Sequence, residues 1–297
     1  MEGDGLRGTI LRGIGGFYYA LDDAGAVSEL RAQAKIRRER LKPLVGDLVE
    51  FEPGQGEENG WVKQILPRKN QLVRPPVANI DMVVIVAAVA SPDPDLLLID
   101  RLMINARRAG IGVRLALNKC DLDPEAARWL AEQYRGAEVE PIIVSTRTGE
   151  GVEALRASLA GRVHALAGQS GAGKSSLISA LYGLRLETGD LSRKIERGKN
   201  TTRHSELIPV PGGGMVLDTP GFSLLETGLF DPLELKACYP EFVEYEGSCF
   251  FSPCAHVTEP RCGVREAVAA GKISAERHAR YCELFEEAKL NWRNRYD

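Results

Sequence analysis

The sequence has no long apolar run and no strong excess of charge. Its longest apolar run, Met82 to Ala90, falls well short of the ~20 residues that a membrane-spanning helix needs. The first residues, MEGDGLRG, show no basic segment followed by an apolar one, which is the pattern of a secretory signal peptide. Its 38 Lys and Arg nearly balance its 41 Asp and Glu. We therefore expect a cytoplasmic protein without a membrane partner, whose nucleic-acid contacts, if any, come from local patches.

Cysteine is also scarce, with 6 residues in 297. In a reducing compartment, clustered cysteines are more often metal ligands than disulfides. Three of them surround a histidine in the pattern Cys249-x4-Cys254-x-His256-x5-Cys262. Four such ligands suit tetrahedral zinc and leave no open position, so we predict one structural Zn²⁺. The alternative is a set of unpaired buried cysteines.

The distribution of strand and helix patterns predicts three units. Short β-prone runs separated by turn residues fill the first seventy positions and suggest a small barrel of the oligonucleotide-binding (OB) type. After the Pro-marked boundary RPPVAN, strand and helix patterns alternate, which is typical of a parallel sheet covered by helices on both faces. We predict an α/β protein with an OB barrel (1–72), a nucleotide-binding domain (73–226) and an α-helical zinc domain (227–297).

The barrel region contains the densest positive patch of the chain, RAQAKIRRERLK, at residues 31–42. We expect this patch to contact RNA phosphates, which would make binding salt-dependent; the alternative is a solvated basic loop. Barrel aromatics could stack on bases, but period-2 alternation predicts that some fill the barrel core. The basic residues are Lys35, Arg37, Arg38, Arg40 and Lys42; the aromatic ones are Phe17, Tyr18, Tyr19 and Trp61.

A phosphate-binding loop is predicted where GQSGAGKS follows a β-branched strand and opens a helix. Its glycines let backbone N–H groups point at phosphate oxygens, and the helix N-terminus adds its dipole. Lys174 should reach the β- and γ-phosphates, and the Ser175 hydroxyl should bind Mg²⁺. The predicted nucleotide-binding residues here are Gly168, Gln169, Ser170, Gly171, Ala172, Gly173, Lys174, Ser175 and Ser176.

Two further segments fit the switches of a nucleotide hydrolase. In the segment Asp218-Thr-Pro-Gly221, Asp218 can hold Mg²⁺ through water, and the Gly221 N–H can sense the γ-phosphate. Thr201 and Thr202 lie between this segment and the phosphate-binding loop. One of them, for which we favour Thr202, should close over Mg²⁺ when GTP is bound.

A base-recognition loop is predicted at Asn118-Lys119-Cys120-Asp121, at the end of a strand. The Asp121 carboxylate can accept the N1 and N2 protons of guanine, a donor pair that adenine lacks. Ser145 and Thr146 open the segment STRTG after the next strand and match the loop that supports the guanine O6. We therefore predict GTP and GDP as ligands, with ATP disfavoured.

The order of these motifs is reversed, because the base-recognition loop precedes the phosphate-binding loop. Cutting an ordinary GTPase after its second switch and joining its old ends would produce this order without disturbing the sheet. Phe222, just after the second switch, then leads directly into the zinc domain. We hypothesise that a nucleotide-driven movement of this switch displaces the whole zinc domain.

With these motifs the chain resembles, over essentially its full length, the circularly permuted, small-ribosomal-subunit-dependent GTPases of bacteria. The resemblance rests on the barrel, on NKCD, STRTG, GQSGAGKS, KNTTRH and DTPGF in this order, and on the Cys₃His module. It implies GTP hydrolysis late in the assembly of the small (30S) subunit, binding through 16S rRNA and faster hydrolysis on the subunit. It further implies help in releasing an assembly factor. We expect a monomer.

Two positions affect the placing of the hydrolytic water. Phe222 stands where Ras-like enzymes have the water-orienting glutamine, as the resemblance leads us to expect. Many relatives have a histidine directly before the Thr-Thr pair, whereas this chain has Asn200, and His204 lies beyond the pair. Asn can orient water but cannot act as a base near neutral pH, so we predict slow intrinsic turnover.

Three alternatives remain at this stage. The first is a nucleotide-gated rRNA-binding adaptor with negligible hydrolysis, which Asn200 favours. The second is a GTPase that acts on another RNA, such as the large subunit or transfer RNA. An ATP-using transporter subunit is disfavoured by Asn118 and Asp121 and by the lack of a transporter signature.

Overall fold

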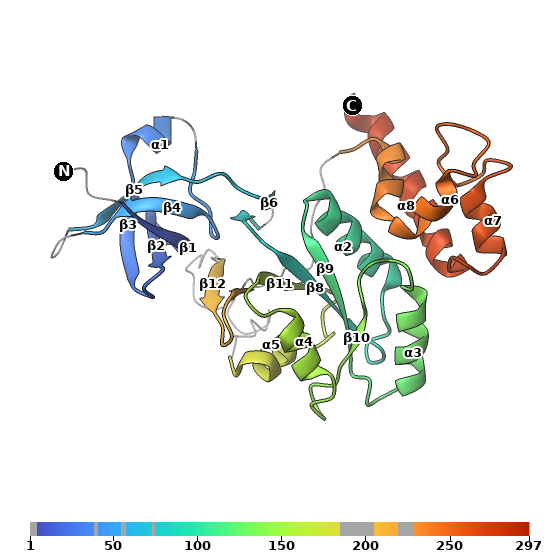
Figure 1. Ribbon diagram of the computed structural model, residues 1–297, viewed down its shortest axis with the longest axis horizontal. Coiled ribbons are helices and arrows are strands. Elements are labelled where there is room, and N and C mark those ends of the chain that lie inside the picture. The colour runs from blue at the N-terminus through green and yellow to red at the C-terminus, as the bar shows by residue number, and fades with distance from the viewer. Residues whose placement is uncertain are drawn as a thin grey trace, which may run out of the picture.

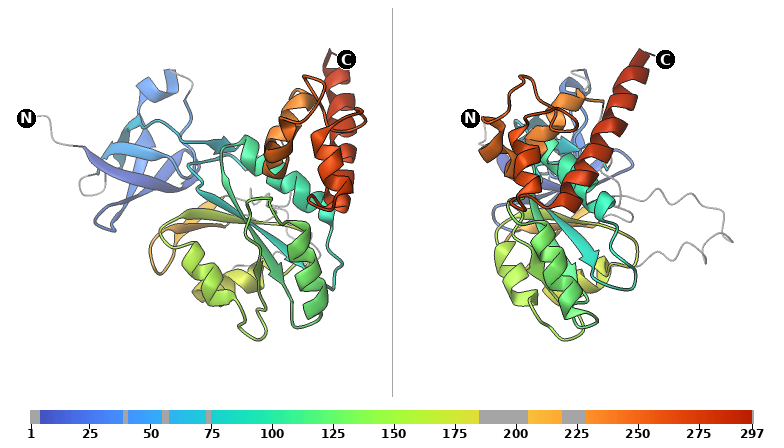
Figure 2. Two further views of the ribbon diagram at one scale, coloured as in Figure 1. Left: turned by 45° about the vertical axis from the view of Figure 1, so that its right-hand side comes forward. Right: turned by 90° about the vertical axis from the view of Figure 1, so that its right-hand side faces the viewer.

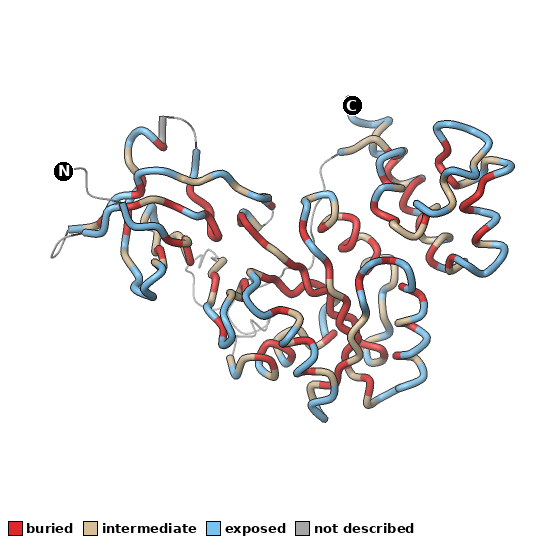
Figure 3. Tube along the Cα trace, viewed as in Figure 1, coloured by how far each residue is buried: buried red, intermediate tan, exposed pale blue. Residues whose placement is uncertain are grey.

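The computed structural model describes residues 5–38, 41–54, 58–72, 75–184, 205–218 and 229–296. In it, a barrel, an α/β sheet domain and a helical C-terminal body follow one another along the chain (Figure 1). The buried residues concentrate in the strands of the central sheet and in the facing sides of the helices (Figure 3). None of the described helices combines the length and apolar character that a membrane crossing requires.

The predicted barrel is confirmed. Its strand order is β1-β2-β3-β5-β4, and pairing of β4 with the first half of β1 closes it. Alternate side chains such as Ile10, Val49 and Phe51 fill its interior. The helix α1 (Ala34–Arg38) follows β3. The barrel strands are β1 (Leu6–Ile14), β2 (Phe17–Asp22), β3 (Val27–Ala32), β4 (Leu48–Glu52) and β5 (Gly60–Ile65).

A short segment connects the barrel to the central sheet. It contains the paired strands β6 (Gln71–Leu72) and β7 (Val77–Ala78), which lie on either side of the predicted domain boundary after residue 72. Arg68 donates to both carboxylate oxygens of the buried Asp47, from Nε at 2.6 Å and from Nη2 at 2.8 Å.

The division into 1–72, 73–226 and 227–297 stays a prediction, and residue 226 lies outside the described residues.

The central sheet has the order β10-β9-β8-β11-β13-β12 and is parallel except for the antiparallel strand β12. Side chains of β8 alternate between two cores. Val83 and Ile85 pack with α2 and α3, whereas Val84 and Val86 pack with α4 and α5. The elements are β8 (Met82–Ala88), α2 (Leu96–Arg108), β9 (Gly112–Asn118), α3 (Pro124–Gln133), β10 (Ile142–Ile143), α4 (Val152–Ser158), β11 (Val163–Ala167), α5 (Lys174–Tyr182), β12 (Glu206–Pro209) and β13 (Met215–Asp218).

The C-terminal body is helical and packs against α2 (Figure 2). Its core is aromatic: Tyr239, Phe242 and Tyr281 contact one another with ring centroids 4.8 to 5.1 Å apart. The elements are η1 (Pro232–Cys238), η2 (Pro240–Phe242), α6 (Val243–Glu246), α7 (Gly263–Ala269), α8 (Ala275–Arg293) and η3 (Asn294–Tyr296).

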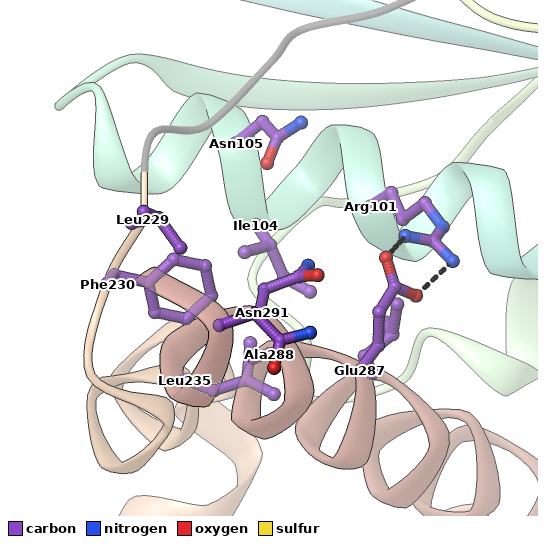
Figure 4. Close-up of a pocket in the computed structure, with 11 residues that line it drawn as sticks. Arg101, Ile104, Asn105, Leu229, Phe230, Leu235, Glu287, Ala288 and Asn291 are labelled. Atoms are coloured by element: carbon purple, nitrogen blue, oxygen red, sulfur yellow. Dashed lines mark hydrogen bonds and ion pairs between the residues drawn. The ribbon is translucent and has the colours of Figure 1, made fainter. Parts of the chain in front are cut away.

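Ion pairs join α2 to α8. The fully buried Asp100 accepts hydrogen bonds from Arg277 Nη1 at 2.5 Å and from Arg280 Nε at 2.6 Å. Nearer the surface, Arg101 pairs with Glu287 beside a cavity of about 410 Å³ between the two helices (Figure 4). The helical body is therefore fixed to the central sheet domain through α2.

Candidate functional site

The phosphate-binding loop runs from the end of β11 to the first residue of α5, as predicted. Gly168 has φ +135° and Gly173 has φ +95°, a region that L-residues with a side chain rarely adopt. A Cβ on Gly168 would lie 2.2 Å from the Val86 carbonyl oxygen, and one on Gly173 would lie 2.3 Å from Asn118 Nδ2. Both positions therefore require glycine, and the loop packs against two neighbouring strands.

The Lys174 side chain contacts the backbone of the predicted phosphate-binding loop. Its Nζ donates to the carbonyl oxygens of Gly168 at 2.7 Å and Gln169 at 2.9 Å. Burial lowers the pKa of Lys174, and an anion at this place would oppose that shift. Of the other loop residues, Ala172 is buried, Ser175 is half-buried and Ser170, Gly171 and Ser176 are exposed.

Asn118 joins the base-recognition loop to the phosphate-binding loop. Its fully buried side chain donates from Nδ2 to the Ala172 carbonyl at 2.9 Å and accepts the Thr146 N–H at 3.4 Å. Three predicted segments from the ends of β9, β10 and β11 thus meet at one amide. In an open α/β sheet, ligands bind at this edge, outside the carboxyl ends of the strands.

Two neighbouring side chains hold the carboxylate of Asp121. Ser145 Oγ donates to its Oδ1 at 2.5 Å, and Arg147 Nε lies 2.8 Å from its Oδ2. The hydrogen bond from Ser145 is the main reason why the pKa of Asp121 is lowered, and the charge of Arg147 adds to it. The carboxylate is thus ionised and oriented, as the recognition of two guanine protons requires. No role for Arg147 was predicted from the sequence.

Residues 91–95, which precede α2, contact both the base-recognition loop and the phosphate-binding loop. The sequence did not indicate these contacts. Lys119, which has φ +65°, donates from Nζ to the Ser91 carbonyl oxygen. The Asp95 N–H donates to Gln169 Oε1 at 3.4 Å, and the Asp95 side chain caps α2 by accepting the Leu98 N–H at 2.9 Å. The N-terminus of α2 therefore contacts the nucleotide loops, whereas other residues of α2 contact the C-terminal body.

Asp218 is the last residue of β13, at the same edge of the sheet. It is half-buried, and burial raises its pKa, to which the charge of Glu206 adds. A bound cation would oppose this shift and favour the carboxylate. The remaining predicted switch residues, Asn200, Thr201, Thr202, His204, Gly221 and Phe222, lie outside the described residues.

The predicted metal ligands come together as one cluster. The ligand atoms of Cys249, Cys254, His256 and Cys262 all lie within 4.8 Å of one another. Cys249 Sγ lies 3.8 Å from Cys262 Sγ and 3.6 Å from His256 Nδ1. Tetrahedral zinc with Zn–S of about 2.3 Å and Zn–N of about 2.0 Å would place its ligand atoms roughly 3.5 to 3.8 Å apart. The donor set and its spacing fit Zn²⁺.

The surroundings of the cluster orient these ligands. His256 Nε2 lies 3.3 Å from Glu246 Oε1, which directs Nδ1 toward the cysteines, as second-shell carboxylates do in zinc sites. Burial raises the pKa of Cys254 to about 12, so without a cation this thiol stays neutral. A divalent cation would stabilise the thiolate form of Cys254, which could then bind the cation as a ligand. Neither Glu246 nor its role was predicted from the sequence.

The barrel aromatics are divided between its interior and its outer surface. Tyr18 packs against the barrel core, whereas Trp61 is 44% exposed. Phe17 and Tyr19 carry guanidinium groups over their rings, with Arg31 Cζ at 4.5 Å and Arg12 Cζ at 4.4 Å from the centroids. Of the basic patch, Lys35 and Lys42 are exposed, and the side chains of Arg37, Arg38 and Arg40 lie outside the described residues.

Comparisons with known proteins agree with the geometry of the site. The family model described as RsgA GTPase matches residues 65–228, and the one described as RsgA N-terminal domain matches residues 7–62. The chain is 43% identical to a protein of Agathobacter rectalis named small ribosomal subunit biogenesis GTPase RsgA, over 96% of this chain and 98% of that protein. A protein of the same name from Caldanaerobacter subterraneus subsp. tengcongensis is 42% identical, over 98% of both chains.

Solved structures are similar over nearly the whole chain. The crystal structure of YjeQ from Thermotoga maritima matches with a TM-score of 0.84 and 36% identity, over 95% of this chain and 98% of that one. The crystal structure of YloQ, described as a circularly permuted GTPase, matches with a TM-score of 0.82 and 30% identity, over 98% of both chains. The permuted order of the loops is thus shared with a solved relative.

Proposed function

The chain belongs to the RsgA family of GTPases, and on that premise we propose that it hydrolyses GTP to GDP and phosphate in the biogenesis of the small ribosomal subunit. The observation that carries this proposal is the junction at Asn118. One buried amide holds the guanine-recognition loop against the phosphate-binding loop, in a chain aligned end to end with relatives of that name. The adaptor with negligible hydrolysis is not favoured, because the curated relatives are named as GTPases.

We propose the following roles in nucleotide binding. The base is held by Asp121, with Asn118, Lys119, Ser145 and Thr146 fixing the loops around it. The phosphates take the place of the Gly168 and Gln169 carbonyls at Lys174, whose ammonium then neutralises the charge that develops on the β- and γ-phosphate oxygens. Backbone N–H groups from Gly168 to Ser176 surround the phosphates.

Mg²⁺ would be held by the hydroxyls of Ser175 and Thr202 and, through water, by Asp218. When bound, it neutralises charge on the β- and γ-phosphates. Thr201 lies beside Thr202 in the first switch, and the Gly221 N–H would contact the γ-phosphate.

Hydrolysis needs a water in line with the bond between the γ-phosphorus and the bridging oxygen. Its oxygen forms the new bond to phosphorus as the bridging bond breaks, GDP leaves with the electron pair, and the water proton passes to phosphate. We propose that Asn200 orients this water, because Asn can both donate and accept a hydrogen bond. Replacing Asn200 by His should raise the intrinsic turnover.

The Cys₃His cluster would hold one structural Zn²⁺, since all four ligand positions are filled by protein atoms. We also propose that the protein is a cytoplasmic monomer that binds 16S rRNA and promotes release of an assembly factor. The displacement of the zinc domain by the second switch stays a prediction. The buried Asp100 fixes this domain to α2. This contact supports a second route, through α2, by which the bound nucleotide would act on the zinc domain.

RNA contact is proposed for the barrel patch with Lys35, Arg37, Arg38, Arg40 and Lys42. The test is cosedimentation with separated small and large subunits, in GTP analogue and in GDP. We expect GTP-dependent binding to small subunits, weakened by R37E/R38E with GTP affinity unchanged and a shallower salt dependence. Binding to large subunits would contradict the proposed partner, and unchanged binding of R37E/R38E would exclude this patch.

A further inference from the structure

Among the described strands, the barrel pairs with the central sheet at a single place. Strand β1 of the barrel pairs antiparallel with β12 of the sheet, with Arg12 opposite Glu206 (Figure 1). The two side chains form an ion pair, with Arg12 Nη1 at 3.2 Å from Glu206 Oε1. Strand β12 is thus held between the barrel on one side and β13 on the other.

This junction lies at the nucleotide edge of the sheet. Glu206 is directly opposite Asp218 in the β12–β13 pair, and Asp218 ends β13 at the edge where the nucleotide loops meet. The segment that connects the barrel to the sheet is held at the opposite edge of the sheet by Asp81, which precedes β8. Its carboxylate binds Lys69 Nζ at 2.5 Å and accepts the N–H of Val163, the first residue of β11, at 2.8 Å. If the barrel changes its orientation about this anchor, we expect the position of β12 to change with it, because β12 pairs with the barrel strand β1.

Arg12 is restrained within the barrel. Its guanidinium lies 4.4 Å from the centroid of the Tyr19 ring, on the neighbouring strand β2, and Tyr19 is hydrogen-bonded to Glu29 of β3. Both Arg12 and Glu206 have 41% of their side-chain surface exposed, so their attraction is screened and rearranges easily. The contact therefore ties β12 to the barrel without adding much to the stability of the fold.

We propose that the Arg12–Glu206 pair is the positioning contact through which subunit binding by the barrel accelerates GTP turnover. Arg12 is not among the proposed nucleotide-binding residues. It would act only through β12 and the end of β13. The inference rests on the proposed function, because it requires a GTPase that responds to the small subunit. Coupling of this kind can be carried by rigid elements that connect two sites, and here the four adjacent paired strands β2, β1, β12 and β13 provide them.

The test compares Arg12→Gln with wild type in turnover alone and on saturating small subunits. The energy of an exposed ion pair corresponds to at most about a fivefold change in rate. We expect R12Q to lower kcat on subunits by about two- to fivefold, with KM for GTP, basal turnover and subunit affinity unchanged. Arg12→Lys keeps the charge and should restore most of the stimulation.

Arg7→Gln is the matched control. Arg7 lies on the same strand and pairs with Glu50 at 2.8 Å, but both residues belong to the barrel. R7Q should be stimulated like wild type. In a double-mutant cycle, R12Q/E206Q should show the same ratio of stimulated to basal turnover as R12Q alone, because the second change removes a partner already lost.

The inference would be overturned by equal stimulation of R12Q and wild type, by an equal loss in R7Q, or by a loss that follows weaker subunit binding. Additive losses in R12Q and E206Q would also contradict it, since the two side chains would then act separately. If wild type itself is not stimulated, the proposed response to the subunit fails as well. The two failures are therefore distinguishable in one set of assays.

Discussion

Replacing Asp100 by Asn should detach the C-terminal body from α2. Asp100 is fully buried and accepts from Arg277 at 2.5 Å and Arg280 at 2.6 Å. Asn is similar in shape but neutral, so it leaves two buried cations with less compensation. Removing one partner of a buried ion pair costs about 3 to 5 kcal/mol. Because Arg277 keeps its second partner, Glu241, we expect about 3 kcal/mol.

The same two helices supply the control. Arg101 and Glu287 also join α2 to α8, but their side chains are 38% and 41% exposed. Glu287→Gln should therefore cost less than about 1 kcal/mol. Urea unfolding of the zinc-loaded chains measures both values, and proteolysis of the C-terminal body under native conditions reports its detachment. A cost for D100N below about 1 kcal/mol, or equal to that of E287Q, would refute the reasoning.

Three further predictions concern the candidate sites. Asn118→Ala removes hydrogen bonds to Ala172 and Thr146, each worth about 1 kcal/mol, and should weaken GTP and GDP binding about tenfold or more in fluorescent-nucleotide titrations; unchanged affinity would show that the two loops hold their places without this amide. Asp121→Asn removes a charged acceptor worth about 1.5 to 3 kcal/mol and should weaken GTP binding roughly 10- to 150-fold without weakening ATP binding; a parallel loss of ATP would contradict guanine recognition there. Cys254→Ala should abolish stoichiometric zinc and reduce the helical circular dichroism signal, whereas Cys282→Ala, which changes a cysteine outside the cluster, should retain both; retention of zinc by C254A would contradict the ligand set.

The sequence predicted the sites better than it predicted their surroundings. The Cys₃His cluster was predicted by spacing alone, and the three nucleotide loops that the structure describes lie at strand ends as expected, because each motif is local in sequence. The sequence shows strand β3 less clearly, because the apolar Val27 is exposed and Ser28 is half-buried, and the alternation is regular only from Glu29 to Ala32. The resemblance to the permuted GTPase family is confirmed by the family models.

Contacts between distant segments could not be predicted. Asp100 lies within the buried face of α2, and its partner Arg277 is on the last long helix. Likewise, nothing local indicates that Arg12 faces Glu206 or that the segment before α2 reaches the phosphate-binding loop. Such pairs are set by how segments that are distant in the sequence pack together, which a single sequence does not show.

This chain is an RsgA-family GTPase, and we propose that it acts on the small ribosomal subunit. The most direct measurement is GTP turnover by the purified protein alone, with purified small subunits, and with large subunits as the control. We expect slow turnover by the protein alone and strong stimulation by small subunits only. Absence of stimulation while GTP-dependent binding persists, or equal stimulation by large subunits, would contradict it.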